Sequence, residues 1–358
     1  MRLRAVLVGC GNMSRRWLDA ALKVGGIEVV GLVDVDLARA RALAEERRLS
    51  DAATGDDLDA MLAMAKPDVV FDTVVPEARF NVTLTALRHG CHVLSEKPMA
   101  DTIDHARDLV RAAREAKRLH VIVQNRRYIE GVRRLRSFVE SGAIGAVTGV
   151  HTDFFLAPHF GGFREEMRNV LLIDMAIHTF DAVRYVINGA PLAVYCHEAN
   201  PAGSWYAHGA SAFAIFEFER GVTYTYRGSW CAQGLRTSWE SSWRITGEKG
   251  TLTWDGHDAF HAEREGATGV GVLRDGAPLP IPSAPETMRI GGHEGVLRDF
   301  VEALETGVAP ETVSSENFKS LAMTFAAIES ARLKRRVPVP TLASENAPNS
   351  NALATAEM

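Results

Sequence analysis

Two groups of polar residues have the side-chain types and the placement that proton-transfer chemistry requires. Lys97 lies in the segment SEKPMA, directly after a short apolar run, and Pro98 disfavours a helical conformation for it. A lysine at the carboxyl end of a parallel strand lies where open α/β sheets bind ligands. Asp174 and His178 are four residues apart in LLIDMAIHTFDAVRYVING, so they share a face if this segment is a helix.

Each group also has an ordinary structural explanation. A lysine at a strand end can simply be exposed, and Asp174 and His178 can form an internally satisfied pair in a core, with Asp181 one turn further on. Against this, burying several polar side chains on an otherwise apolar helix is costly. A metal site would need a third ligand at a suitable spacing, and the sequence offers none, so we expect no metal.

A strand, a tight turn and a helix at the N-terminus predict a dinucleotide site. In AVLVGCGNMSRRWLDAAL, Gly9 permits the sharp exit from the strand, and Gly11 lets the backbone approach a pyrophosphate. The amides at the start of the following helix would face its negative charge. Ser14 stands where a third glycine is common and is small enough for that position. Asp34 ends the next apolar run at the spacing expected of a ribose-binding acid.

Asp34 also indicates whether the protein binds NAD or NADP. A carboxylate at Asp34 would accept hydrogen bonds from both ribose hydroxyls and would repel a 2′-phosphate, which favours NAD. Arg39 and Arg41 follow and could accommodate NADP, although they are more simply explained as exposed helix residues. We therefore expect NAD to be preferred, with NADP as the alternative.

The first 125 residues alternate short apolar runs with helical patterns, which predicts an α/β, doubly wound parallel sheet of the Rossmann type. The expected strands are Ala5–Val8, Val29–Val33, Val69–Val75, His92–Ser95 and Val121–Val123. The expected helices are Arg15–Lys23, Leu37–Arg48, Leu58–Ala65, Arg79–His89 and Thr102–Lys117.

Beyond about residue 145 the pattern changes to longer runs in which polar and apolar residues alternate. This pattern predicts an α+β domain with a large, mostly antiparallel open sheet. The expected strands are Val147–Phe155, Ala193–His197, Ala212–Glu219, Val222–Ser229, Ser242–Thr246 and Thr251–Trp254, and the expected helices are Leu171–Ile187, Gly295–Glu305 and Glu316–Lys334. We expect a cofactor domain over residues 1–125, a substrate and oligomerisation domain over 126–340, and a mobile tail over 341–358.

Composition excludes several classes of partner. The 358 residues carry 40 Lys and Arg against 45 Asp and Glu, a net charge of −5, which is unlike a nucleic-acid-binding surface. The sequence has no apolar run long enough to cross a membrane, and its four cysteines are widely spaced. We expect a soluble cytoplasmic protein with reduced thiols. An open sheet would leave an apolar face, which predicts association into a dimer or tetramer.

The motifs GCGNM, Asp34, Glu96-Lys97-Pro98 and Asp174-x-x-x-His178 occur in an order and at intervals that resemble the Gfo/Idh/MocA family of oxidoreductases. The likeness extends from residue 1 to about 338. It implies that Lys97, Asp174 and His178 flank the substrate carbinol beside the nicotinamide. The implied reaction is hydride transfer between the cofactor and a secondary alcohol of a sugar, glycoside or cyclitol. Either Lys97 or His178 could be the base.

We assign further residues to this site. The cofactor would contact Gly9, Gly11, Asn12, Met13, Asp34, Thr73, Glu96 and Asn125, and the substrate would contact Arg126, His151, Arg164 and Tyr206. Arg164 could select an acidic substrate, but we favour an ion pair with Glu165 or Glu166. The chain departs from the family pattern in DTVVPEARFNV, where Arg79 or Phe80 lies near the position of a common histidine.

Two other functions remain as alternatives. Relatives in this family include enzymes that retain NAD and cleave a glycosidic bond through transient oxidation. A catalytically silent, cofactor-sensing binding protein is the third possibility. It is disfavoured because Lys97, Asp174 and His178 are all present.

Overall fold

The computed structural model describes residues 2–267, 272, 274–284 and 290–343. The chain divides into two compact units between Asn125 and Arg126. The first unit also contains Arg289–Phe318, and the second contains Arg126–Met288 and Lys319–Thr341. The expected tail falls, from residue 344 onward, outside the described residues.

The first unit is built on a parallel sheet that, in the described part of the chain, has six strands in the order β3-β2-β1-β4-β5-β6. The chain runs outward in one direction from β1 and in the other from β4, so the strand order reverses between them. The strands are β1 (Leu3–Val8), β2 (Ile27–Val33), β3 (Ala53–Gly55), β4 (Val69–Asp72), β5 (His92–Ser95) and β6 (His120–Ile122).

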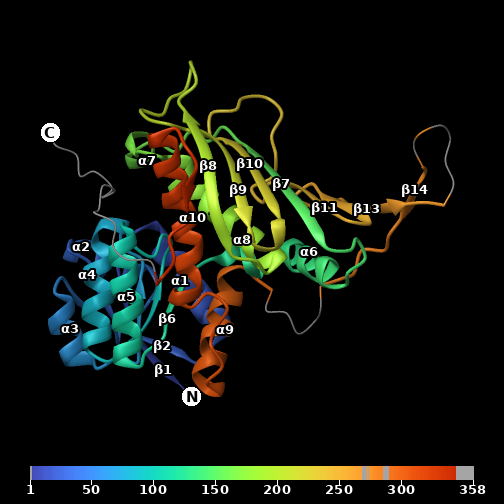
Figure 1. Ribbon diagram of the computed structural model, residues 1–358. Helices are drawn as coiled ribbons and strands as arrows, with labels where there is room; N and C mark the ends of the chain where they lie inside the picture. Colours follow the sequence, from blue (N-terminus) through green and yellow to red (C-terminus); the bar gives the residue numbers. More distant parts are fainter. Residues whose placement is uncertain (1, 268–271, 273, 285–289, 344–358) are drawn as a thin grey trace. The chain divides into compact units, whose positions relative to one another are not determined.

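Helices cover both faces of this sheet, as a doubly wound fold requires. Helices α3, α4 and α5 pack in sequence against one another, whereas α1 contacts α9 (Figure 1). The Arg15–Glu46 and Arg47–Asp19 ion pairs join α1 to α2. The helices are α1 (Asn12–Val24), α2 (Leu37–Glu46), α3 (Leu58–Ala65), α4 (Pro76–Arg88), α5 (Ile103–Ala116) and α9 (His293–Thr306).

The segment Arg289–Phe318, which we expected in the second domain, is part of the first unit. Helix α9 packs on α1, and the backbone beyond it reaches the edge strand β6. There, Ile122 donates its amide to the Thr312 carbonyl at 3.0 Å. This segment lies far along the chain from the strands of the first sheet, so its contacts with that sheet leave no local signal in the sequence.

The second unit contains a sheet that, among the described residues, has nine strands in the order β14-β13-β12-β11-β7-β10-β9-β8-β15. Every neighbouring pair is antiparallel except β7 and β10, which confirms the expected mostly antiparallel sheet. The strands are β7 (Val147–Phe155), β8 (Pro191–Ala199), β9 (Ser211–Phe218), β10 (Thr223–Ser229), β11 (Ser242–Gly247), β12 (Gly250–Trp254), β13 (Phe260–Glu265), β14 (Gly276–Pro278) and β15 (Val337–Pro338).

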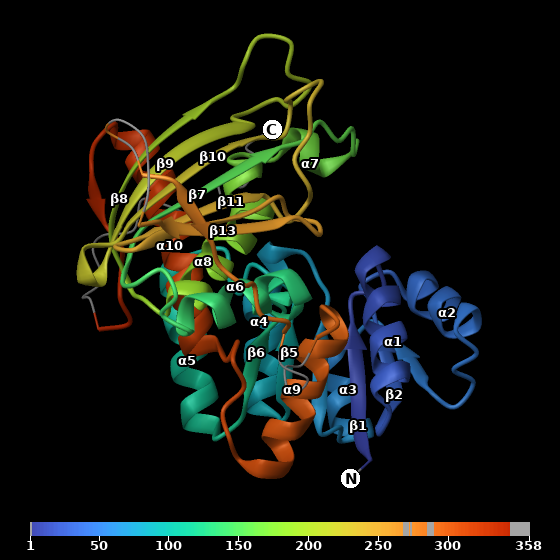
Figure 2. The ribbon, with the colours of Figure 1, turned by 90° about the vertical axis from the view of Figure 1, so that its right-hand side faces the viewer.

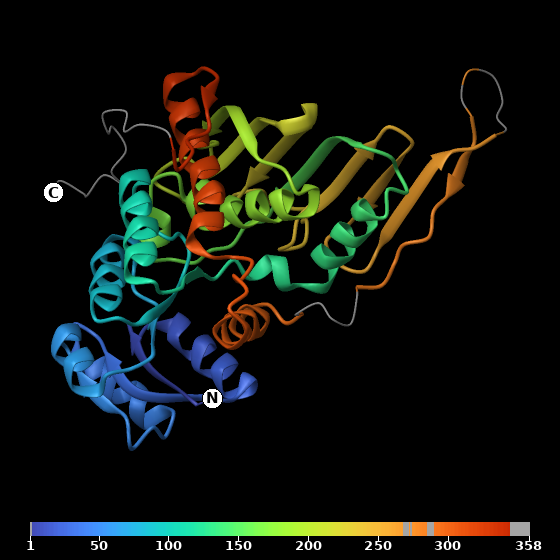
Figure 3. The ribbon, with the colours of Figure 1, turned by 60° about the horizontal axis from the view of Figure 1, so that its bottom comes forward.

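One face of the nine-stranded sheet is covered by helices. Figure 2 shows α8 (Ile177–Ile187) and α6 (Glu130–Glu140) on the same side of the curved strand layer, and Figure 3 shows these green helices from below. Phe180 of α8 packs its ring 4.9 Å from Phe216 and 5.3 Å from Tyr226. The other helical segments are η1 (Asn125–Tyr128), α7 (Phe163–Glu166), η2 (Leu171–Ala176), η3 (Glu219–Gly221) and α10 (Ser314–Leu333).

The helix expected over Leu171–Ile187 forms, but its first six residues are π-helical and only Ile177–Ile187 is α-helical. A π-helical turn is wider than an α-helical turn and is often found at functional sites. Helix α10 begins in the first unit and continues into the second. No helix in the described residues has the length and apolarity to cross a membrane.

Candidate active site

Gly9 and Gly11 form the turn after β1, for different physical reasons. Gly9 has φ +90°, and a Cβ there would lie 2.9 Å from the backbone of Thr73 and Val74. The turn therefore requires glycine at this position. Around a Cβ built on Gly11, by contrast, no described atom lies within 4 Å. This open space is where a phosphate could approach the backbone.

The start of α1 is available to an anion. Gly11 occupies the N-cap position, and among the described residues no side chain caps the helix and no acidic residue lies in its first turn. The Ser14 hydroxyl, which is buried, donates to the Gly11 carbonyl at 2.5 Å and so holds the turn against the helix. Asn12 is exposed and Met13 is half-buried at this end of the helix. Uncapped amides and the helix dipole favour negative charge here.

Asp34 lies at the carboxyl end of β2, beside the glycine turn. Its carboxylate accepts hydrogen bonds from the Cys10 amide at 2.7 Å and from the Asp36 amide at 3.0 Å. Burial, and then the charge of Asp34, raise the pKa of the Cys10 thiol to about 12. Arg39 is exposed and pairs with Asp36 at 3.4 Å. Each carboxylate oxygen of Asp34 keeps a second lone pair with which it could accept a ribose hydroxyl.

Thr73 and Glu96 follow the next two strands, β4 and β5. The Thr73 hydroxyl donates to the Gly9 carbonyl at 2.5 Å and so supports the turn. Glu96 accepts a hydrogen bond from the Trp17 indole at 2.8 Å and lies 3.8 Å from His293. Burial acts to raise the pKa of Glu96, but the contacts with His293 and Trp17 and the Lys97 charge outweigh it and lower the pKa.

Lys97 and Asn125 complete the set in the first unit. Lys97 is half-buried, and its peptide bond to Pro98 is cis. The Asn125 amide lies 3.5 Å from Nδ1 of His293, at the start of α9. His293 was missed by the sequence analysis, because α9 was expected in the other domain. The residues expected to bind the cofactor thus lie at the carboxyl ends of β1, β2, β4, β5 and β6, along one edge of one sheet.

In the second unit, Asp174 and His178 differ in exposure from the helix around them. In the fully described segment from Val170 to Ile187, every other residue is buried, and only these two are partly exposed. Asp174 lies in the π-helical turn and His178 in the α-helical turn that follows. The helix therefore presents one carboxylate and one imidazole outward, as a site would require.

The structure pairs Arg164 with Asp174, not with Glu165 or Glu166 as we expected. The Arg164 Nε donates to the Asp174 carboxylate at 2.9 Å. The guanidinium also lies over the rings of Phe163 and Phe160, at 4.9 and 5.2 Å from their centroids. Neighbouring residues on the four-residue helix α7 point in different directions, which explains why sequence adjacency failed as a guide.

Arg126 and His178 line the same small hollow. Met175, Trp239 and Glu240 are among the other residues around it. Arg126 forms an ion pair with Glu240 and donates to the Trp239 carbonyl at 2.8 Å. Burial lowers the pKa of Arg126 to about 10. Glu240 and Trp239 were not identified from the sequence, and only the density of aromatic residues in this region gave a signal.

Asp181 is separate from the site. Its carboxylate is fully buried and accepts bonds from the Arg127 guanidinium at 2.6 and 2.8 Å and from the Ser320 hydroxyl at 2.6 Å. This geometry is typical of a structural ion pair that joins three segments of the second unit. The helix thus combines one structural acid with the two outward-facing residues, Asp174 and His178.

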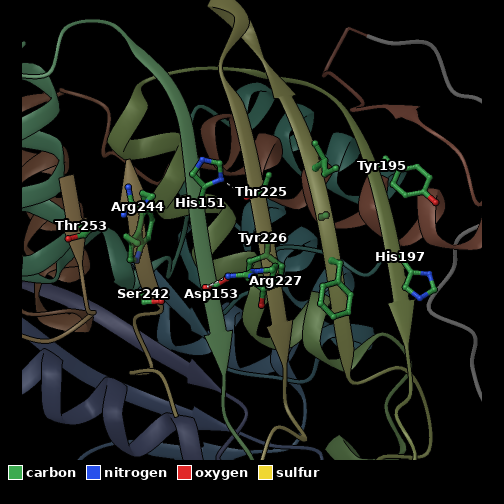
Figure 4. Close-up of a pocket in the computed structure, with 14 residues that line it drawn as sticks. His151, Asp153, Tyr195, His197, Thr225, Tyr226, Arg227, Ser242, Arg244 and Thr253 are labelled. Carbon is green, nitrogen blue, oxygen red and sulfur yellow. Dashed lines mark hydrogen bonds and ion pairs between the residues drawn. The ribbon is translucent and has the colours of Figure 1, made fainter. Parts of the chain in front are cut away.

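Two residues expected to bind substrate lie elsewhere in the second unit. The Tyr206 hydroxyl donates to the Pro158 carbonyl at 2.9 Å, and burial raises its pKa to about 12. His151 lies on the outer face of the nine-stranded sheet, 2.7 Å from the Thr225 hydroxyl (Figure 4). His178 belongs to α8, which packs on the other face. The structure does not bring His151 and His178 together. Within the described residues, no three His, Cys, Asp or Glu side chains are grouped as a metal site.

The parallel sheet with a glycine turn and an acid at its strand ends, followed by a second sheet domain, defines a two-domain dinucleotide-binding protein. Two family models match the chain. The oxidoreductase family model with the NAD-binding Rossmann fold covers residues 3–124, and the GFO/IDH/MocA C-terminal domain model covers residues 132–253. The chain belongs to the Gfo/Idh/MocA oxidoreductase family, a family of NAD(P)-dependent enzymes.

Similar proteins cover almost the whole chain. A 1,5-anhydro-D-fructose reductase of Ensifer adhaerens is 25% identical, over 94% of this chain and 98% of the relative. A D-apiose dehydrogenase of Paraburkholderia graminis is 28% identical, over 96% of this chain and 92% of the relative. An oxidoreductase from Agrobacterium radiobacter, crystallised with NAD+, L-tartaric acid and magnesium, has a TM-score of 0.80 at 20% identity, covering 95% and 99% of the two chains. That last likeness concerns the fold.

Proposed function

We propose that this protein interconverts a secondary alcohol and a ketone on a sugar, glycoside or cyclitol, with NAD as the preferred cofactor. One observation supports this most strongly. The open glycine turn, Asp34, Thr73, Glu96 and Lys97 lie along the same carboxyl edge of one parallel sheet, beside the point where the strand order reverses. Open α/β sheets bind dinucleotides at this place.

The bound nicotinamide would supply hydride chemistry, accepting hydride at C4 when the alcohol is oxidised. The protein has to hold the alcohol and remove its hydroxyl proton as the carbonyl forms. We assign the proton transfer to Lys97 or His178 and the binding of a neighbouring hydroxyl to Asp174. Each of these side chains is partly exposed among buried neighbours, which suits a group that must meet a ligand.

The substrate class is inferred from the polar character of the second unit's site and from the relatives. Arg126 and Arg164 are each paired with a carboxylate, Glu240 and Asp174 respectively, so neither cation lacks a counter-charge. This pattern suits a neutral polyhydroxylated molecule, whose hydroxyls can bond to both members of each pair. Two relatives, at 25% and 28% identity, are named for sugar-derived substrates.

The preference for NAD rests on Asp34. The carboxylate is held in place by two backbone amides beside the glycine turn, so it cannot readily swing away from a 2′-phosphate. The neighbouring Arg39 is exposed and paired with Asp36. We expect kcat/KM to be higher with NAD than with NADP, and Asp34→Ser to reduce that preference.

The test is a panel of sugars, glycosides and cyclitols incubated with the protein and either NAD or NADP, with nicotinamide absorbance as the readout. Net reduction of added cofactor by at least one member, lost in Lys97→Ala, supports the proposal. Cleavage of a glycoside without net reduction would favour the NAD-retaining alternative. Full turnover by Lys97→Ala would show that the assignment of Lys97 is wrong.

We also propose that the outer face of the nine-stranded sheet is covered by a second copy of this chain. A hollow of about 690 Å³ lies on this face (Figure 4). Tyr195, Phe213 and Ile215 are between 44% and 51% exposed, and cross-strand pairing puts Tyr195 beside Ile215. These residues form an apolar patch on the neighbouring strands β8 and β9. An exposed apolar patch on an open sheet is typical of an association surface, and a two-fold contact would bury the same patch on both copies.

Sedimentation equilibrium of the full chain tests this association. We expect a dimer or tetramer, and a shift toward monomer for Phe213→Glu with Ile215→Lys. Met64→Lys is a suitable control because Met64 is exposed on α3 in the first unit. A monomeric wild-type protein at micromolar concentration would refute the proposal.

A further inference from the structure

Arg79 lies in the segment where the sequence departs from the family pattern and is one of the most deeply buried charged residues in the described structure. It is 1% exposed and lies in the first turn of α4, directly after the loop that follows β4. A buried guanidinium is costly unless its donors are satisfied. The contacts of Arg79 therefore indicate what the position is used for.

The Arg79 guanidinium joins two loops at the carboxyl edge of the sheet. One terminal nitrogen donates to the Pro98 carbonyl at 2.5 Å, and the other donates to the Val74 carbonyl. Pro98 directly follows Lys97. Val74 directly follows Thr73, whose hydroxyl supports the Gly9 carbonyl. A single planar side chain thus connects the segment that carries Lys97 with the segment that supports the cofactor turn.

The Arg79 guanidinium also contacts a buried polar network that begins at Asp72. Its Nε forms an ion pair with the Asp72 carboxylate at 3.6 Å, which is beyond hydrogen-bond distance. That carboxylate accepts a hydrogen bond from the Thr83 hydroxyl at 3.0 Å. The Ser95 hydroxyl lies 3.4 Å from Asp72 and 3.1 Å from the His120 ring. Burial raises the pKa of Asp72 although Arg79 acts to lower it. Burial, and then the charge of Arg79, lower the pKa of His120 to about 3, so the imidazole is neutral at pH 7.

We propose that Arg79 is a positioning residue for Lys97 and for the glycine turn of the cofactor site. It fixes the backbone of the two loops that carry Lys97 and Thr73, and we assign it no contact with the substrate. This inference rests on the proposed function, because it assigns Lys97 to the chemistry. The planar, forked guanidinium is required, since a lysine ammonium at the same place could not reach two carbonyls and a carboxylate with the same geometry.

The test compares Arg79→Lys and Asp72→Asn with the wild type, with Arg88→Lys as the control. Arg88 lies on the same helix but is exposed. Single-turnover hydride transfer at saturating NAD and substrate gives an amplitude and a rate constant. The amplitude reports the fraction of folded active sites, and the rate constant reports their geometry. A misplacement of about 1 Å can slow a positioned reaction about 100-fold.

We expect Arg79→Lys to lower the rate constant about 100-fold while keeping most of the amplitude, and Asp72→Asn to lower it less. We expect no change for Arg88→Lys. A loss of amplitude at an unchanged rate constant would show that Arg79 only stabilises the fold, and would overturn the inference.

Hydrogen–deuterium exchange of the full chain separates this inference from the proposed function. We expect Arg79→Lys to speed exchange in the segments 73–75 and 97–100 and leave the second unit unchanged. If exchange in these segments is faster in Arg79→Lys but the wild-type protein turns over no polyol, the proposed reaction is refuted and the role of Arg79 in the two loops is retained. Unchanged exchange in both segments would overturn the inference whatever the activity.

Discussion

The two units hold their candidate site residues by different means. In the first unit, the cofactor residues around the glycine turn are fixed by backbone geometry and by hydrogen bonds to backbone groups. Glu96 and Asn125, which contact side chains, are the exceptions. Gly9 has a backbone that only glycine suits, and Thr73, Asp34 and Arg79 all bond to main-chain atoms of neighbouring loops. In the second unit, Asp174 pairs with Arg164 and Glu240 pairs with Arg126, all through side chains.

This difference has a chemical meaning. A dinucleotide brings the same pyrophosphate and ribose groups to every enzyme that uses it, so backbone contacts that do not depend on side-chain identity are suitable for binding it. The substrate specificity of a pocket lined by paired side chains can change when a single residue is substituted. The family's cofactor half should therefore vary little, whereas the pairs Arg164–Asp174 and Arg126–Glu240 are positions where this chain can acquire its own specificity.

The strongest test of the comparison is the loss of one reacting group from each unit. We expect Lys97→Met and His178→Asn each to lower kcat by about 10²- to 10⁴-fold, because either group could transfer the proton or hold the carbinol oxygen. Lys249→Met is the control, since Lys249 is exposed in the second unit. Steady-state rates with the best substrate of the panel provide the measurement. Retained activity in either variant would show that the replaced residue takes no part in the chemistry.

The two glycines of the turn should separate stability from cofactor binding. Gly9→Ala places a Cβ 2.9 Å from backbone atoms, so we expect a lower unfolding midpoint, by several degrees, and weak cofactor binding. Gly11→Ala meets no described atom within 4 Å, so we expect an ordinary midpoint but about tenfold weaker NADH binding. Thermal unfolding and fluorescence titration with NADH distinguish the two. Equal effects on both quantities would contradict the separate roles.

Replacing Arg164 should affect the substrate and not the cofactor. We expect Arg164→Met to raise KM about tenfold, because Asp174 loses the partner that orients it, and to leave the dissociation constant of NADH unchanged. Glu165→Gln is the matched control on the same short helix. A change in NADH affinity as large as the change in KM would show that the two units are not functionally separate.

The smallest expected effect concerns pH. Burial lowers the His120 pKa from its ordinary value of 6.5 to about 3 in the folded chain. Below pH 6.5, therefore, His120 gains a proton in the unfolded chain but not in the folded chain, and the stability of the fold falls as pH drops. Burial raises the Glu198 pKa to about 7, so as pH rises from about 4.5 to 7 the unfolded chain loses a proton that the folded chain keeps, and stability falls.

Denaturant unfolding between pH 5 and 7 measures both effects. Relative to the wild type, Glu198→Gln should gain stability as pH rises, and His120→Gln should gain it as pH falls. Parallel curves for all three proteins would contradict these protonation states.

The fold was largely predictable from the sequence because its elements have strong local patterns. Buried parallel strands are continuous apolar runs, and β7 and β9 alternate, so these elements were confirmed to within a few residues. The strands β3, β13, β14 and β15 and the return of α9 to the first unit were missed. Strands of two or three residues, such as β3, β14 and β15, have no periodicity, and the position of α9 depends on contacts distant in sequence.

The candidate site was predictable in part. The spacing of Asp174 and His178 identified the outward-facing residues of their helix, but not the π-helical turn that begins it. The side-chain partners of the site residues could not be predicted from the sequence. Arg164 pairs with Asp174 and not with its sequence neighbours, and His293 contacts Glu96 from a segment about 200 residues away. Side-chain pairing across loops is decided by three-dimensional packing, which local sequence does not encode.

We have proposed that Lys97 and His178 act on one carbinol beside the nicotinamide. A crystal structure of the protein with NADH and a polyol that it oxidises tests this most directly. We predict that the Lys97 ammonium and a His178 ring nitrogen both lie within about 2.6–3.2 Å of the same substrate hydroxyl. A substrate hydroxyl held near the nicotinamide but beyond the reach of both side chains would contradict the claim.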